Sequence, residues 1–136
     1  MKIFILLLFL APFSAYTCSC GDWDDIRQMS KDADTVVLAV PTEDSSFFRA
    51  GEYAPLYKTG MKIVKKYKGK YENFFYLLAE KADGGNCGLN FKKHSGLFLI
   101  FGHKYNNSYY ISDACSIGDV SPFNEEVQRA IEQLDN

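Results

Sequence analysis

The sequence predicts one mainly β domain, a small five-stranded barrel with a short helix near each end. Short runs of β-branched and aromatic residues are separated by turn-forming residues, as in proteins built from short strands. Apolar residues at helical spacing occur near both ends of the domain. Four cysteines that follow an apolar N-terminal run indicate an exported domain held by disulfides.

The N-terminal run predicts a signal peptide over residues 1–17. Lys2 precedes an apolar stretch over 3–13, which is too short to span a bilayer as a helix but suits an export signal. Ala15 and Thr17 are the small residues expected two positions apart just before a cut at Cys18. We therefore expect a domain over residues 18–136 that is secreted and extracellular, or periplasmic in a bacterial host. No other segment is apolar enough to span a membrane.

The elements of the domain follow in order from its apolar patterns. A short helix is expected over 22–31, where Trp23 and Ile26 lie at helical spacing. Strands are expected over 34–41, over 58–81 as a pair about a turn at 68–70, over 96–102 and over 108–115. Ser121 is expected to cap a final helix with Pro122 at its first position; its apolar face would hold Phe123, Val127, Ala130, Ile131 and Leu134. Five strands between two helices predict a closed or partly closed barrel of the OB type.

Composition and motifs argue against several function classes. The net charge of −2 makes nucleic acid or an anionic membrane an unsuitable main partner. A lysine cluster could bind polyanions as OB barrels do, but its position at a hairpin tip favours a solvated turn; its members are Lys62, Lys65, Lys66, Lys68 and Lys70. His94 and His103 have no companion at metal-ligand spacing and read as surface or turn residues. Without a nucleophile–base pair, phosphate loop or metal-ligand cluster, we expect no enzyme, no cofactor and no metal of its own.

Two smaller features have alternative explanations. Trp23 is expected to pack on the core rather than to contact a partner. Asn106 begins an Asn-Asn-Ser glycosylation sequon, which has meaning only in a eukaryotic host.

Two of the four cysteines lie directly after the expected cleavage point, and the other two lie far along the chain. Cys18 and Cys20 are too close in sequence to pair readily with each other. The expected disulfides therefore join this tripeptide to Cys87 and to Cys115, in either order. Each would close a loop of many tens of residues and fasten the chain start to the barrel.

The Cys-Ser-Cys start resembles that of the tissue inhibitors of metalloproteinases, whose inhibitory domain is a netrin-like OB barrel. The similarity continues through "DADTVVLAVP", "YKTGMKIVKKYKGKY", "NCGLNFKKHSGLFLIFG" and "YYISDACSIGDVSPF", over essentially the whole of residues 18–136. The resemblance implies the pairs Cys18–Cys87 and Cys20–Cys115, because the family joins its cysteines at matching separations.

The resemblance also implies a mechanism. The α-amine and carbonyl oxygen of Cys18 would chelate the catalytic zinc of a target metalloproteinase and displace its attacking water. An α-amine has an ordinary pKa of about 8 and must be neutral to coordinate, so binding should release a proton and weaken at low pH. Ser19 would enter the primary specificity pocket. Further contacts would come from Cys20 and Gly21, and from Asn86 and Cys87 within the neighbouring segment over 84–87; together these form the predicted contact ridge. The long segment over 42–57 could extend the contact. We expect the inhibitor to be a monomer.

The chain departs from the family pattern in ways that keep other functions open. The position of the family's third disulfide in this domain holds Ser30, and we expect only the inhibitory domain of the family, without its second domain. Asp22, Asp24 and Asp25 follow the tripeptide where the family favours apolar residues and proline, and unpaired charge at an interface is costly. One alternative is therefore a non-inhibitory netrin-like binding or structural module. The other is a lipoprotein anchored at Cys18, although "AYTC" lacks the usual aliphatic residue and lipidation would leave one cysteine unpaired.

Overall fold

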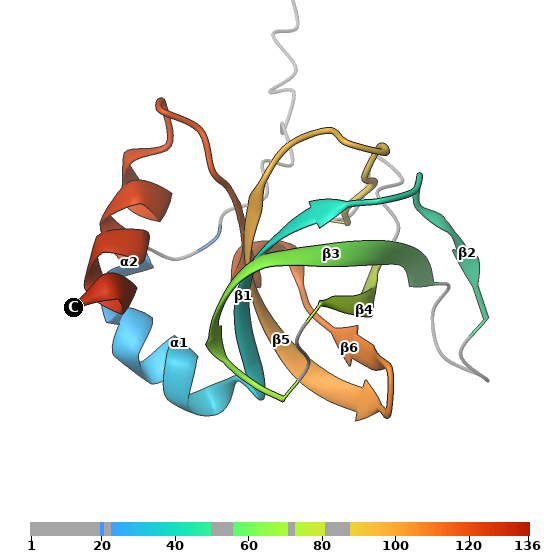
Figure 1. Ribbon diagram of the computed structural model, residues 1–136, viewed down its shortest axis with the longest axis horizontal. Coiled ribbons are helices and arrows are strands. Elements are labelled where there is room, and N and C mark those ends of the chain that lie inside the picture. Colours follow the sequence, from blue (N-terminus) through green and yellow to red (C-terminus); the bar gives the residue numbers. More distant parts are fainter. Residues whose placement is uncertain (1–19, 21–22, 50–55, 71–72, 81–87) are drawn as a thin grey trace, which may run out of the picture.

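The computed structural model describes residues 20, 23–49, 56–70, 73–80 and 88–136. Their strands form one sheet that closes into a barrel, with two helices packed together on one side (Figure 1). The helical elements are η1 (Trp23–Asp25), α1 (Ile26–Asp32), η2 (Ala114–Ser116) and α2 (Glu125–Asp135). The strands are β1 (Thr35–Pro41), β2 (Ser46–Phe48), β3 (Leu56–Lys68), β4 (Phe74–Glu80), β5 (Phe98–Asn106), β6 (Tyr109–Ile111) and β7 (Ile117–Asp119).

Five strands close the barrel in the order β1-β3-β4-β6-β5, and β5 pairs back onto β1. All of these pairs are antiparallel except β4 with β6, which run parallel. β2 and β7 are additional strands that pair with β3 and β5 respectively. The predicted five-stranded, OB-like barrel with a helix near each end is therefore confirmed.

β1 explains how the sequence builds two apolar layers. Successive side chains of a strand point to opposite faces, so a strand buried on both faces needs apolar residues at every position. Val37 points into the barrel and Val36 points out toward the helices. The barrel interior is formed by Val37, Ala39, Met61, Phe75, Leu77, Phe91, Ile100, Tyr110 and Ile117. The layer under the helices is formed by Ile26, Ala33, Val36, Leu38, Leu99, Phe101, Val127 and Ala130.

The turn after β3 corrects the interpretation of the lysine cluster as merely solvated. Gly69 has φ +116°, and a Cβ there would lie 2.6 Å from Thr35 Oγ1, so the turn needs glycine. Lys68 Nζ donates to the backbone carbonyls of Ser30 (2.7 Å) and Lys31 (3.0 Å) near the C-terminal end of α1. A cation is favourable there because it satisfies helix carbonyls and opposes the helix dipole.

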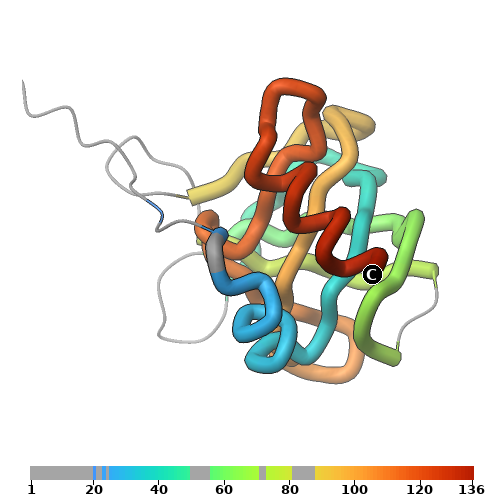
Figure 2. Tube along the Cα trace, turned by 90° about the vertical axis from the view of Figure 1, so that its left-hand side faces the viewer, coloured from blue at the N-terminus to red at the C-terminus, as the bar shows by residue number. Residues whose placement is uncertain are grey.

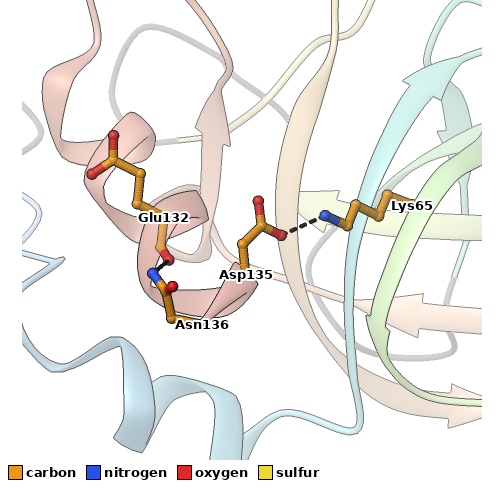
Figure 3. A network of polar contacts seen from close by, with 4 residues as sticks. All are labelled: Lys65, Glu132, Asp135 and Asn136. Atoms are coloured by element: carbon orange, nitrogen blue, oxygen red, sulfur yellow. Dashed lines mark hydrogen bonds and ion pairs between the residues drawn. The ribbon is translucent and has the colours of Figure 1, made fainter.

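Lys65, from the same cluster, forms an ion pair with Asp135 at the end of α2 (Figure 3). In the same turn, the side-chain amide of Asn136 donates to the backbone carbonyl of Glu132 (2.6 Å). The Lys65 ammonium, through its hydrogen bond with Asp135, lowers the pKa of that carboxyl, and Asp135 in turn raises the pKa of Lys65. Two of the five lysines, Lys65 and Lys68, thus bond to helices, and all of the five except Lys68 are exposed.

The start of α2 differs from the prediction. Asn124 caps this helix, with its side-chain oxygen accepting from the Val127 N–H (3.3 Å). Ser121 instead builds a turn: its hydroxyl accepts from the Phe123 N–H and its carbonyl from the Asn124 N–H. Phe123 therefore lies before the helix and is 94% exposed, so its predicted place on the apolar face is wrong. Val127 and Ala130 are buried as predicted.

The described parts of the predicted contact segment over 42–57 include strand residues. Ser46–Phe48 pairs with residues 56–58 as β2, and Tyr57 already belongs to β3. Trp23, in contrast, packs on the core as predicted. Within the described parts of the chain, no helix is both long enough and apolar enough to span a bilayer.

Candidate functional site

The candidate site is the edge of the barrel where the Cys-Ser-Cys tripeptide is fastened. Of the predicted contact residues, the structure describes Cys20, which is exposed. The others lie outside the described residues, as does the predicted Cys18–Cys87 disulfide; they are Cys18, Ser19, Gly21, Asn86 and Cys87. Asp22 also lies outside the described residues, and for Asp24 only the backbone, in η1, is described.

Cys20 forms a disulfide with Cys115, 95 residues further along the chain, with a Cα–Cα distance of 5.1 Å. This pairing agrees with the one implied by the family resemblance. Cys115 lies in η2, which begins with Asp113 as its cap: the Asp113 carboxylate accepts from the Cys115 N–H (2.9 Å). The disulfide therefore attaches the start of the chain to a turn that is itself fixed between β6 and β7.

Trp23 provides a second attachment three residues after Cys20. Its indole N–H donates to the carbonyl oxygen of Cys115 (3.0 Å), so one turn holds both residues. The ring meets Phe101 edge to face, with centroids 5.7 Å apart. It also lies directly over Gly118, where a Cβ would come within 2.5 Å of the indole. Because Gly118 in β7 has no side chain, it leaves room for the indole ring of Trp23.

Asp25 has a structural role in this segment. It is the N-cap of α1, and its carboxylate accepts from the Gln28 N–H (2.9 Å). Such a bond satisfies one of the free donors at the start of a helix. One of the three carboxylates that follow the tripeptide therefore has a hydrogen-bond partner at the helix start.

A second anchored segment begins at residue 88, directly after Cys87. The Leu89 N–H donates to the Glu80 carbonyl (2.8 Å), which joins the two described ends of the connection between β4 and β5. Phe91 is 4% exposed and enters the barrel interior beside Phe98, with ring centroids 4.9 Å apart. The chain on the far side of Cys87 is therefore held by both a backbone bond and a core side chain.

The connection between β1 and β2 is joined to this second segment. Ser45 exchanges two hydrogen bonds with Phe91: its N–H donates to the Phe91 carbonyl (2.9 Å) and its hydroxyl accepts from the Phe91 N–H (2.7 Å). Asp44 accepts from the Lys93 N–H (2.8 Å), and the His94 N–H, at a residue with φ 57°, donates to Pro41 (2.9 Å). These hydrogen bonds hold the connection between β1 and β2 against the segment from residue 88.

The two anchored segments lie at the same side of the barrel. β4 and β6 are parallel neighbours, and the Ser112 N–H donates to Leu78 (3.0 Å), so the ends of these strands come together. In Figure 2, the blue start of the described chain and the orange turn near η2 lie close together at the left, and the yellow segment from residue 88 is on the same side of that view. The described segments next to the two parts of the predicted contact ridge, residues 18–21 and 84–87, thus lie on the same side of the barrel.

Among the described residues, no group of three or more His, Cys, Asp and Glu side chains is placed to hold a metal ion. The residues that position the edge were not predicted as such, apart from Trp23 as a packing residue. Glu80 and Leu89 bond through their backbone, and Ser45 through its backbone and its hydroxyl. No distinctive sequence pattern marks such hydrogen bonds.

No protein-family model matches the sequence, and no curated protein matches it either. The family resemblance therefore remains a prediction that rests on the motifs of this chain.

Proposed function

We propose that this protein is a secreted inhibitor of zinc metalloproteinases, with a netrin-like barrel of the kind found in the tissue inhibitors of metalloproteinases. The mature chain would begin at Cys18, whose α-amine and carbonyl oxygen chelate the target's catalytic zinc. Ser19 would enter the adjoining specificity pocket, and Gly21, Asn86 and Cys87 would complete the contact. The protein supplies no catalytic group and no metal.

The Cys20–Cys115 disulfide is the observation that carries the proposal. It links the tripeptide to the barrel at the separation that the family resemblance requires. Trp23 is attached to the same turn by its hydrogen bond to Cys115, so the chain is held at Cys20 and again at Trp23. A rigid inhibitor edge loses little conformational entropy on binding, which favours affinity.

A chelating N-terminus would act by occupying the coordination position that the protease needs for water. The amine nitrogen and carbonyl oxygen of one residue can close a five-membered ring on the metal, and a catalytic zinc keeps such a position open. Chelation requires the neutral amine, so the bound state releases a proton and inhibition should weaken as the pH falls.

A non-inhibitory binding or structural module is the second candidate. The anchoring of Trp23 and the capping by Asp25 favour it, because both would also stabilise a tethered chain end that has no partner. A lipoprotein, with the same domain held at a membrane through a lipidated Cys18, is a third candidate.

The test is an inhibition screen with the mature, disulfide-bonded protein against a panel of zinc metalloproteinase catalytic domains, with a serine protease as control. The proposal predicts inhibition of at least one metalloproteinase at micromolar concentration and none of the control. Intact mass of the exported protein identifies the material tested: a start at Cys18 with a free amine is required, and a lipid adduct would support the anchored form. A protein with the free amine that inhibits no panel member would contradict the proposal.

A further inference from the structure

Phe123 is the most exposed of the large apolar side chains that the structure describes, at 94%. It lies in the turn between β7 and α2, seen as the red loop at the upper end of α2 in Figure 1. A phenylalanine this exposed gains almost nothing from burial in the free protein, so its ring is available to a partner.

The turn that carries Phe123 is rigid. The Phe123 N–H donates to the Ser121 hydroxyl (3.2 Å), and the Asn124 N–H donates to the Ser121 carbonyl (3.0 Å). Farther out, the Asn124 amide donates to the Asp119 carbonyl and the Gln128 amide donates to the Ser121 carbonyl, each at 3.1 Å. The ring is thus held outward on a fixed backbone, and preorganisation of this kind lowers the entropy lost on binding.

The surface around Phe123 is acidic. An open hollow beside the ring is lined by polar residues that include three carboxylates, those of Asp119, Glu125 and Glu126, and one guanidinium, that of Arg129. A partner that covers the ring would need to compensate these negative charges, and complementary charge is what selects a partner at such a rim.

This surface is continuous with the candidate site. A second, smaller hollow is lined by Trp23, Ala130 and Gln133 together with Glu126 and Arg129, and the last two also line the hollow at Phe123. From Glu125, two residues after Phe123, to Gln133 the chain advances along α2 by roughly 12 Å, a span that fits within one partner's contact area in a standard interface. Trp23 itself is bonded to Cys115, the disulfide partner of Cys20.

We propose that Phe123 anchors a second contact surface for the metalloproteinase that the N-terminus inhibits, and that this surface fits an apolar pocket with a basic rim on that enzyme. The inference rests on the proposed function, because it assigns the same partner to both surfaces. Phe123 would fill the pocket, while Glu125 and Glu126 would face lysine or arginine side chains around it. Aromatic anchors in pockets typically account for a large share of binding energy.

The experiment separates this surface from zinc chelation. Binding of the wild-type protein, Phe123→Ser and the control Val64→Ser is measured on a panel of immobilised metalloproteinase catalytic domains, each zinc-loaded and zinc-depleted. Val64 is a suitable control because it is 60% exposed, lies on β3, and lines neither of the two hollows at α2. Thermal unfolding is recorded for all three proteins, and Phe123→Ser should match the wild type because its ring contributes almost no buried area.

We expect wild-type binding to the zinc-depleted form of at least one enzyme, weaker than to its zinc-loaded form. Phe123→Ser should weaken both by about thirtyfold or more, the loss typical of an anchor residue, whereas Val64→Ser should change neither.

Equal affinities for Phe123→Ser and the wild type, or no wild-type binding to any panel member, would overturn the inference. It would also be overturned if the ring proved to be covered by a second copy of this chain, seen as concentration-dependent dimerisation that Phe123→Ser removes. Binding to the zinc-depleted enzyme that depends on Phe123 without any inhibition of the zinc-loaded enzyme would instead contradict the proposed function alone.

Discussion

The indole N–H of Trp23 donates a hydrogen bond to the carbonyl oxygen of Cys115, a residue 92 positions further along the chain. Since Cys115 is also the disulfide partner of Cys20, one turn of the barrel edge holds the N-terminal segment at two points. A covalent bond fixes where this segment is attached, and the indole fixes the direction in which it leaves. Four predictions concern this arrangement and its surroundings.

Trp23→Phe and Trp23→Ala should separate the hydrogen bond of Trp23 from its packing. The phenylalanine variant keeps a ring against Phe101 but leaves the Cys115 carbonyl without its donor, which should lower the free energy of unfolding by about 1 kcal/mol. The alanine variant also loses the ring contacts and should cost about 3 kcal/mol. Denaturant unfolding measures both, and equal losses in the two variants would show that the ring contacts contribute nothing.

Gly118→Ala should destabilise the protein by overpacking. A Cβ at this position would lie 2.4 Å from a Val127 methyl and 2.5 Å from the Trp23 ring, so helix α2 or the indole must move. Overpacking typically costs about 1–3 kcal/mol. In a double-mutant cycle, Trp23→Leu should relieve part of this loss. Strictly additive losses would mean that Trp23 does not press on Gly118.

Removal of the Cys20–Cys115 disulfide by a paired serine substitution should cost about 4 kcal/mol, because the bond closes a very long loop in the unfolded chain. The free energy of unfolding under non-reducing conditions measures this loss. The barrel should still form at low temperature, since its strands and core do not depend on either cysteine. A variant as stable as the wild type would show that the bond does not stabilise the protein by restricting its unfolded chain.

The Lys65–Asp135 ion pair should make the attachment of α2 depend on pH. Lys65 lowers the pKa of Asp135, so the stabilisation by this pair is present above the ordinary pKa of an aspartate. It is lost as the pH falls through the lowered value. At the other end of the range, Asp135 raises the pKa of Lys65, so the stabilisation is lost as the pH rises through that raised value.

NMR titration of the Asp135 carboxyl tests this pair. The pKa should be below that of an ordinary aspartate in the wild type and should rise in Lys65→Met. Both side chains are solvent-exposed, so the shift should shrink in high salt. The same pKa in Lys65→Met and the wild type would contradict the assignment.

The barrel could be predicted from the sequence because its strongest elements have unambiguous patterns. The run over 34–41 is apolar at nearly every position, and β1 is indeed buried on both faces. β2 and β7 are three residues each, too short to show a period, and they form because longer strands offer free edges for pairing. The cap of α2 was misplaced because Ser121 and Asn124 are both good capping residues, and the hydroxyl of Ser121 bonds two residues ahead instead.

The candidate site could be predicted only in outline. The Cys20–Cys115 pair followed from the family resemblance, since the residues alone left two pairings open. Trp23 was predicted to pack on the core, but its bond to Cys115 joins residues 92 positions apart, and no local pattern reports such a contact. The same is true of Ser45 and Phe91, which are 46 positions apart.

The central claim is that a free α-amine on Cys18 chelates a protease zinc, and a one-residue extension tests it most directly. The mature protein and a matched form with one alanine before Cys18 are compared for inhibition of the metalloproteinase that the mature protein inhibits best. The extension leaves every described contact in place but converts the amine to an amide, which cannot coordinate in the same way. We predict that the extended form inhibits at least about a hundredfold more weakly, because loss of zinc coordination removes several kcal/mol. Equal inhibition by the two forms, or none by either, would contradict the account.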